Sequence, residues 1–332
     1  MMHEQLILFG APGTGKSYRL KEYLDGYGDD KKFRVTIHPE FLYTDFVGQL
    51  LPDTTPGAPA SFVFQEGPFT RALMEAYADS SKDVFLILEE LSRGNVAAIF
   101  GDLFQLLDRD DHFESRYPVR NKNIADKIPT LTTDEIKLPS NFNILCTVNM
   151  NDQNVYPMDT AFKRRFDWEY VSTEPVIDKA TGTRDSHLNN PKVKIAVDKN
   201  RAHDLETTWQ SFYMALNAFI TDKEKGMGKR EDKQVGQFFL DFAEQVVLDS
   251  HSTIVSAADA ANEKINKMIK NKLLLYLWQD VQGIAVMGAE TSLFDKEINS
   301  YDDLYKKFGT DKVFSDAFIE HFLSPGLSSY PY

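Results

Sequence analysis

The feature that most constrains this chain is a glycine-rich octapeptide near its first residue. It satisfies the pattern G-x-x-x-x-G-K-[ST] at every fixed position and consists of Gly10, Ala11, Pro12, Gly13, Thr14, Gly15, Lys16 and Ser17. The apolar run 5–9 before it predicts a buried strand, and residues 18–23 after it predict a helix. Strand, loop and helix together predict an α/β domain that binds a nucleotide.

The residue types of this loop suit phosphate binding. Its glycines let backbone N–H groups turn inward toward an anion. Lys16 can reach the β- and γ-phosphates, and the Ser17 hydroxyl can ligate Mg²⁺. The alternative without function is a glycine-rich turn followed by a chance Lys-Ser pair. The loop does not specify the reaction, because kinases, GTPases and motors share it.

Composition indicates a globular chain with ample material for a core. Its 332 residues are 42% hydrophobic and 12% aromatic. The single cysteine, Cys146, excludes a disulfide framework and a cysteine-cluster zinc site, and its apolar neighbours predict a buried strand position. The scattered histidines predict no metal site beyond the Mg²⁺ of the nucleotide.

Hydropathy and charge limit the partners that we expect. No apolar run approaches the ~20 residues that span a bilayer, and the first residues lack the regions of a signal peptide. We therefore expect a cytoplasmic protein with no membrane partner. The net charge of -13 disfavours direct wrapping of nucleic acid, so DNA would be met through a pore, a local patch or a partner.

The second informative pattern is the apolar run 84–88, which is followed by Glu89 and Glu90. It predicts a buried parallel strand whose end delivers two carboxylates to the nucleotide crevice. Glu89 would then hold Mg²⁺ through water, and Glu90 would polarise the attacking water. Alone, the pattern favours a core strand followed by a solvated acidic turn; downstream of the phosphate-binding loop it favours the nucleotide site.

Periodicity predicts the remaining elements of the first half. We expect strands at 33–37 and 142–148, a helix at 70–77, an amphipathic helix at 96–107, a loop and hairpin within 38–69 and a further loop or hairpin at 112–136.

Four stretches of the first half contain motifs of one protein family. They are residues 86–103, which include Arg93-Gly94-Asn95, and residues 38–46, 138–152 and 158–166. In this order they resemble the Walker B region, the segment after Walker A, the sensor strand with the M-N-x-x-D signature, and the arginine-finger motif of the McrB-like AAA+ proteins. Those proteins are the motor subunits of modification-dependent restriction systems. The resemblance covers residues 5–170, and stretches at 234–239 and 270–277 resemble the helical lid of this family.

The resemblance implies a fold and a set of site residues. The fold is a P-loop AAA+ α/β domain with a parallel-sheet, three-layer core at 1–172, a linker or insertion at 173–204, and a helical lid with C-terminal helices at 205–332. Asn149 would orient the lytic water or sense the γ-phosphate. Arg164 or Arg165 would reach the nucleotide of a neighbouring subunit, and a solvated basic turn is the alternative for this pair.

The function that the resemblance implies is a nucleoside triphosphatase that uses GTP, or ATP, with Mg²⁺. It would form a homo-oligomer, a hexameric ring, and drive an McrC-like nuclease or other effector subunit in DNA restriction or phage defence. One alternative is a MoxR-like ATPase that remodels proteins. Another is a nucleotide-dependent scaffold with weak hydrolysis, which is suggested by Glu89 in place of the usual Asp and by Gln153-Asn154 in place of Arg-Ser.

Helical patterns dominate the second half. We expect helices at 209–220, 257–268, 269–285 and 316–323, another along the stripe of Val235, Phe238, Phe239, Phe242 and Val246, and a late helix opened by a capping box at Ser300.

Overall fold

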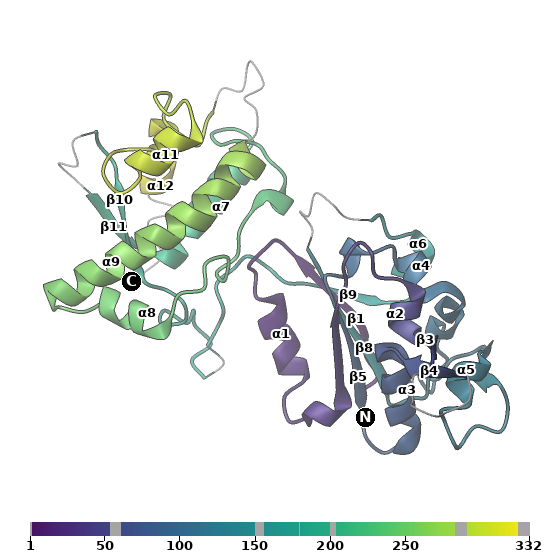
Figure 1. Cartoon of the computed structure of the whole chain (residues 1–332). Helices are drawn as coiled ribbons and strands as arrows, with labels where there is room; N and C mark the ends of the chain where they lie inside the picture. Colours follow the sequence, from purple (N-terminus) through teal and green to yellow (C-terminus); the bar gives the residue numbers. More distant parts are fainter. Residues whose placement is uncertain are drawn as a thin grey trace. The chain divides into compact units, whose positions relative to one another are not determined.

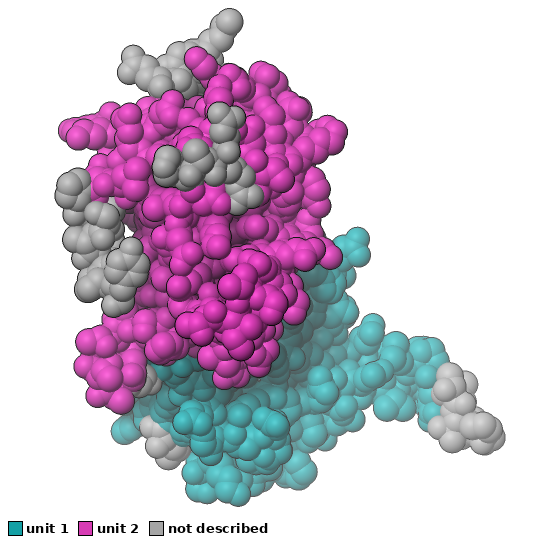
Figure 2. Space-filling view, turned by 90° about the vertical axis from the view of Figure 1, so that its left-hand side faces the viewer, with its two compact units in different colours: residues 1–9, 16–170 teal, residues 10–15, 171–332 magenta. Residues whose placement is uncertain are grey.

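The computed structural model describes residues 2–53, 61–149, 156–178, 180–199, 204–282 and 291–324. Tertiary contacts divide the chain into two compact units. Unit 1 comprises residues 1–9 and 16–170, and unit 2 comprises residues 10–15 and 171–332 (Figure 2).

Unit 1 is built on a five-stranded sheet with the order β2-β5-β8-β1-β9. The strands are β1 Gln5–Gly10, β2 Lys32–Thr36, β5 Val84–Glu89, β8 Phe142–Asn149 and β9 Asp167–Tyr170. The pairs β2–β5, β5–β8 and β1–β9 are parallel. The central strands β5 and β8 are buried over nearly their whole length, which explains their continuous apolar runs. Cys146 lies buried in β8, and burial raises the pKa of its thiol.

The predicted strands of the first half are confirmed, whereas β9 was not predicted. Its sequence Asp167-Trp168-Glu169-Tyr170 is mostly polar and partly exposed. The strand lies at the edge of the sheet and pairs with β1. A short edge strand needs little apolar surface, so its pattern resembles that of a loop.

Helices cover both faces of this sheet, as Figure 1 shows. Helix α1 Lys16–Tyr23 lies on one face, and α2 Tyr43–Val47, α3 Pro68–Ala78 and α4 Val96–Phe100 lie on the other. The second face is sealed by aromatic contacts, with Phe46 centred 5.3 Å from Phe69 and 5.0 Å from Phe100. The predicted three-layer core is therefore confirmed.

Smaller elements decorate unit 1. Hairpins are formed by β3 Gly48–Pro52 with β4 Phe62–Glu66 and by β6 Val119–Arg120 with β7 Glu135–Ile136. Short helices are α5 Lys122–Ala125 and α6 Thr160–Lys163, and 3₁₀ turns occur at Asp29–Lys31 and Leu91–Arg93. The helix predicted at 96–107 is wrong in its second half, because Gly101 adopts φ 52° and residues Gly101–Leu107 continue as a 3₁₀ helix.

Unit 2 contains the antiparallel pair β10 Lys192–Ala196 and β11 Asp204–Thr208 and a group of helices. These are α7 Trp209–Thr221, α8 Glu244–Ser250, α9 Val255–Met268, α10 Leu274–Tyr276, α11 Tyr301–Lys307 and α12 Asp316–Leu323. Segments Ile269–Leu273 and Leu277–Gln282 are π-helical, and Glu231–Lys233 is a 3₁₀ turn. Strand β10 lies within the segment that we predicted as a linker or insertion. The predicted helix at 269–285 extends beyond the described residues after 282.

The helix predicted along the stripe 235–246 is wrong for most of its length, since α8 begins only at Glu244. The buried Asn189 side chain replaces the helical hydrogen bonds there. Its amide donates to the carbonyls of Gln237 at 2.8 Å and Leu240 at 2.7 Å, and its oxygen accepts the N–H of Phe242 at 2.7 Å. The apolar side chains are thus buried by an irregular segment that a distant asparagine organises.

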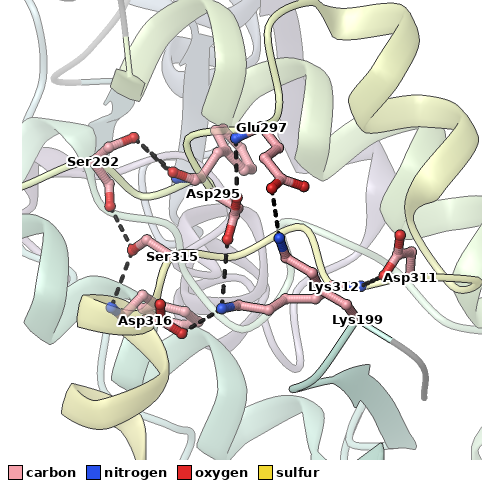
Figure 3. A network of polar contacts seen from close by, with 10 residues as sticks. Lys199, Ser292, Asp295, Glu297, Asp311, Lys312, Ser315 and Asp316 are labelled. Atoms are coloured by element: carbon pink, nitrogen blue, oxygen red, sulfur yellow. Dashed lines mark hydrogen bonds and ion pairs between the residues drawn. The ribbon is translucent and has the colours of Figure 1, made fainter.

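A polar network stabilises the end of unit 2 around α12 (Figure 3). The Lys312 side chain is only 7% exposed, and its ammonium lies 3.5 Å from Asp295 and is also paired with Asp316. Ser315 caps α12 by accepting the N–H of Phe318 at 3.2 Å and donates to the Ser292 carbonyl at 2.6 Å. Ser300 caps α11 in the same way, which confirms the predicted helix start. Within the described residues, no helix is long and apolar enough to cross a bilayer.

Candidate active site

The phosphate-binding loop follows β1 and turns through two glycines in the left-handed region. Gly13 has φ 74° and Gly15 has φ 90°, conformations that cost other residues energy. A Cβ atom on Gly13 would lie 2.3 Å from the Phe239 nitrogen, so a side chain is excluded there. The Thr14 hydroxyl donates to the Ala11 carbonyl at 3.1 Å inside the turn. The loop therefore has the backbone that its glycine spacing predicted.

A second segment of unit 2 holds this loop by its carbonyl groups. The N–H of Gly236 donates to the Pro12 carbonyl at 2.9 Å, and the N–H of Phe238 donates to the Gly13 carbonyl at 2.7 Å. Phosphates are bound by N–H groups, so these bonds do not compete with a nucleotide. Sequence reasoning missed this contact, although the glycine in Gln234-Val235-Gly236-Gln237 was a signal, because a Cβ there would lie 2.3 Å from the Gly13 carbonyl oxygen.

Lys16 and Ser17 continue directly from the loop and begin α1. Lys16 is 7% exposed, and burial lowers the pKa of its ammonium to about 8 while the nearby Glu90 carboxylate opposes this shift. An ammonium group that is shielded from solvent and lies near a carboxylate is suited to bind a phosphate in place of that carboxylate. Ser17 is exposed, so its hydroxyl is accessible to a metal ion.

Glu90 has a strained backbone and a fixed carboxylate. It follows β5 at φ 55° and ψ 41°, the left-handed conformation, which costs about 1–3 kcal/mol for a residue with a side chain. The Asn149 amide nitrogen lies 2.8 Å from both Glu90 carboxylate oxygens, and the Thr147 hydroxyl accepts the Glu90 N–H at 3.2 Å. Arg93 Nε lies 3.6 Å from Glu90 Oε2. Strain of this kind occurs where the surroundings impose it, often at functional sites.

Topology explains why Glu90 and Asn149 meet. Asn149 is the last residue of β8, which lies between β5 and β1 in the sheet. The carboxyl ends of parallel strands lie at one edge, where α/β proteins bind ligands. Two residues that are far apart in the sequence therefore converge at the strand ends. The signature residues Met150, Asn151, Asp152, Gln153 and Asn154 lie outside the described residues.

Glu89 occupies the last position of β5 and is paired with a cation. Arg34 Nη1 lies 2.9 Å from Glu89 Oε1, and the Glu89 side chain is 19% exposed. The Glu89 carbonyl accepts the N–H of Ile37 at 2.8 Å. The Ser17 hydroxyl and the Glu89 carboxylate offer the oxygen ligands that Mg²⁺ prefers. Among the described residues, no cluster of three His, Cys, Asp or Glu could hold a metal by itself.

The two adjacent arginines have different surroundings. Arg165 is 10% exposed: its guanidinium lies 2.6 Å from Asp108 Oδ2, donates to the Ala161 carbonyl at 2.7 Å and lies 4.2 Å from the centre of the Phe104 ring. Arg164 caps the end of α6, and its side chain is exposed. Arg165 thus stabilises its own chain, whereas Arg164 is accessible to another molecule.

Comparison with known proteins agrees with this geometry. The family description AAA domain (dynein-related subfamily) matches residues 5–166. The fold and the site therefore define a P-loop protein of the AAA+ class, a class that binds nucleotides, usually with Mg²⁺, and generally hydrolyses them.

Two curated relatives narrow this class. The chain is 32% identical over 344 residues to the type II restriction enzyme BsuMI component YdiS of Bacillus subtilis (strain 168), an alignment that covers 93% of this chain and 87% of the relative. It is 26% identical over 181 residues to the type IV methyl-directed restriction enzyme EcoKMcrB subunit of Escherichia coli (strain K12), covering 53% of this chain and 36% of that protein. The chain belongs to the McrB-like AAA+ family, and the predicted family and fold are confirmed.

Proposed function

We propose that the chain is a nucleoside triphosphatase that acts as the motor subunit of a restriction system. Residues 10–17 bind the phosphates, and Ser17 and Glu89 hold the accompanying Mg²⁺. Glu90 polarises the attacking water, which Asn149 helps to orient. The observation that carries this proposal is the strained Glu90, with its carboxylate 2.8 Å from the Asn149 amide at the carboxyl edge of the sheet.

The arrangement gives each of these groups a separate role in binding and hydrolysis. Mg²⁺, when bound, neutralises charge on the phosphates. The contacts from the Asn149 amide and from Arg93 fix the direction of the Glu90 carboxylate. The charged Lys16 attracts the phosphate chain from a buried position. The Glu90 carboxylate is thus held before a substrate arrives, which is the condition for electrostatic catalysis without reorganisation.

Arg164 is our candidate for the residue that completes a neighbouring site. A finger must reach across a subunit boundary, and the exposed guanidinium of Arg164 meets this condition better than that of Arg165, which is paired with Asp108. A finger of this kind increases turnover by about 10³-fold or more in NTPases. The proposal therefore includes a ring-shaped homo-oligomer, a hexamer, with the lid and C-terminal helices in residues 205–332.

The relatives supply the biological setting. Both are components of restriction enzymes, which favours a role in restriction or phage defence. From the resemblance to McrB-like proteins we propose GTP as the preferred nucleotide, an McrC-like nuclease or other effector subunit as the partner, and action in the cytoplasm. DNA would be contacted mainly through the partner. A scaffold with weak hydrolysis is the second candidate, and the pairing of Glu89 with Arg34 is the observation that favours it.

Hydrolysis of GTP and ATP by the pure protein, with and without the effector, tests the proposal. Lys16→Ala should abolish turnover, and the wild type should prefer GTP. A preference for ATP of more than about tenfold, 1.4 kcal/mol, would contradict the GTP assignment and favour a remodelling ATPase. Mass measurement with a non-hydrolysable GTP analogue should detect the ring, and a monomer even with the effector present would contradict an arginine supplied in trans.

A further inference from the structure

Glu89 has a cationic neighbour on the adjacent strand whose role the proposed function does not explain. Arg34 Nη1 lies 2.9 Å from Glu89 Oε1. The Arg34 side chain is 43% exposed, whereas that of Glu89 is 19% exposed. The pair therefore joins a partly exposed guanidinium to a carboxylate that is mostly enclosed.

The register of the sheet makes this pairing specific. Thr36 of β2 lies directly opposite Glu89 of β5. Arg34, two residues before Thr36, lies on the same face as Thr36, because side chains alternate along a strand. Arg34 is thus the diagonal neighbour of Glu89, at a separation that long side chains can bridge.

The extra methylene of glutamate matters for this reach. A Glu carboxylate extends further from the backbone than that of Asp, and the Glu89 backbone is fixed by the bond from Ile37 N–H to its carbonyl. The side chain alone therefore determines where the carboxylate lies. With Arg34 on one oxygen, the carboxylate is partly neutralised, and a divalent cation that approaches it meets a positive charge.

The geometry points to Arg34 as a positioning residue that competes with Mg²⁺ for Glu89 and so raises the Mg²⁺ concentration at which the site binds nucleotide tightly. This inference rests on the proposed function, because it assumes that Glu89 faces the Mg²⁺ of the nucleotide. The exposed Arg34 guanidinium can move from the Glu89 carboxylate into solvent when the metal binds. The site would then respond to free Mg²⁺ rather than hold it permanently.

The test measures the affinity for a fluorescent non-hydrolysable GTP analogue across a Mg²⁺ titration of the full chain. Arg34→Ala should lower the Mg²⁺ concentration at half effect by about fivefold, the scale of a partly exposed ion pair. Arg34→Lys should restore most of the wild-type midpoint. Glu89→Asp, which shortens the acid, should also lower the midpoint, and Arg34→Ala should change little when added to it.

Lys32 provides a matched control. It lies on the same strand and the same face as Arg34, opposite Phe85, and pairs at 3.3 Å with the exposed Asp29. Lys32→Ala removes the same charge from the same strand. It should leave the Mg²⁺ midpoint within about twofold of wild type, because Lys32 lies two residues further than Arg34 from Glu89 along the strand and pairs with Asp29 instead. An equal shift in both variants would attribute the effect to net charge and overturn the inference.

The outcomes separate this inference from the proposed function. If the wild type binds no analogue at any Mg²⁺ concentration, and Lys16→Ala changes nothing, the proposed function fails. If the wild type binds with a clear Mg²⁺ dependence and Arg34→Ala leaves the midpoint unchanged or raises it, the inference alone fails. Thermal unfolding of each variant shows whether a shift of the Mg²⁺ midpoint arises from loss of folded structure.

Discussion

The two units use polar side chains in opposite ways. At the sheet edge of unit 1, the Glu90 carboxylate is held in a strained backbone conformation by Asn149. In unit 2, the amide of Asn189 and the ammonium of Lys312 satisfy neighbouring backbone or carboxylate groups and close the core. The first arrangement costs stability and leaves charged groups for a ligand, whereas the second contributes stability. Substitutions at the two places should therefore separate activity from folding.

Glu90→Gly gives the largest expected effect. It should reduce turnover by about 10³-fold, because the general base is lost, while stability rises by about 1 kcal/mol, since glycine adopts φ 55° without strain. Hydrolysis assays and denaturant unfolding measure the two quantities. Phe113 also has a left-handed backbone, at φ 61°, but its ring contacts His3 and Arg109, so Phe113→Gly is the control for turnover and should leave it unchanged. If turnover survives in Glu90→Gly, the contrast between the units is wrong.

Asn189→Ala in unit 2 should lower the free energy of unfolding, whereas Glu90→Gly should raise it. The substitution removes the bonds to Gln237, Leu240 and Phe242 and should destabilise the fold by about 3 kcal/mol, the cost of leaving buried backbone groups unsatisfied. The exposed Asn299, which bonds to the Glu297 carbonyl at 3.3 Å, is the matched control. Its replacement by alanine should change unfolding by less than about 0.5 kcal/mol. Equal losses at both positions would show that Asn189 does not organise the segment.

Lys312→Met should produce a smaller loss of stability, about 2 kcal/mol, because it leaves the largely enclosed Asp295 carboxylate without its cation. Lys306→Met removes the exposed pair with Asp302 and should cost less than about 0.5 kcal/mol. Urea unfolding of both variants at pH 7 measures the difference. Similar losses of unfolding free energy in the two variants would show that Lys312 contributes no more to stability than an exposed lysine.

The smallest expected effect is a pH dependence at Lys16. Phosphate binding requires the charged ammonium, whose pKa in the free protein is about 8. The dissociation constant for the GTP analogue should therefore be flat below that pH and rise by up to about tenfold per pH unit above it, as binding takes up a proton. Lys16→Met should abolish this slope. A wild-type affinity that stays constant from pH 7 to 9.5 would contradict the role of Lys16.

The same contrast explains what could be predicted from the sequence. The loop at Gly10–Ser17 and the acids Glu89 and Glu90 follow apolar strands, and parallel topology sends strand ends to one edge, so local patterns were sufficient to place them. The helices at 209–220 and 316–323 were predicted because the spacing of their apolar residues is a local pattern.

The errors arose where distant residues decide the backbone. The stripe from Val235 to Val246 has helical spacing, but Asn189 takes over the backbone hydrogen bonds there. The pairing of Arg34 with Glu89 depends on strand register, and the different surroundings of Arg164 and Arg165 depend on Asp108. Spacing along the chain carries no information about such partners.

The central claim, that Glu90 at the carboxyl edge of the sheet is the catalytic base of an NTPase, is tested most directly by single-turnover hydrolysis of GTP by Glu90→Gln with its binding affinity measured in parallel. The account predicts that the analogue still binds within about threefold of wild type, while turnover falls by about 100-fold or more. Unchanged turnover in Glu90→Gln would contradict it.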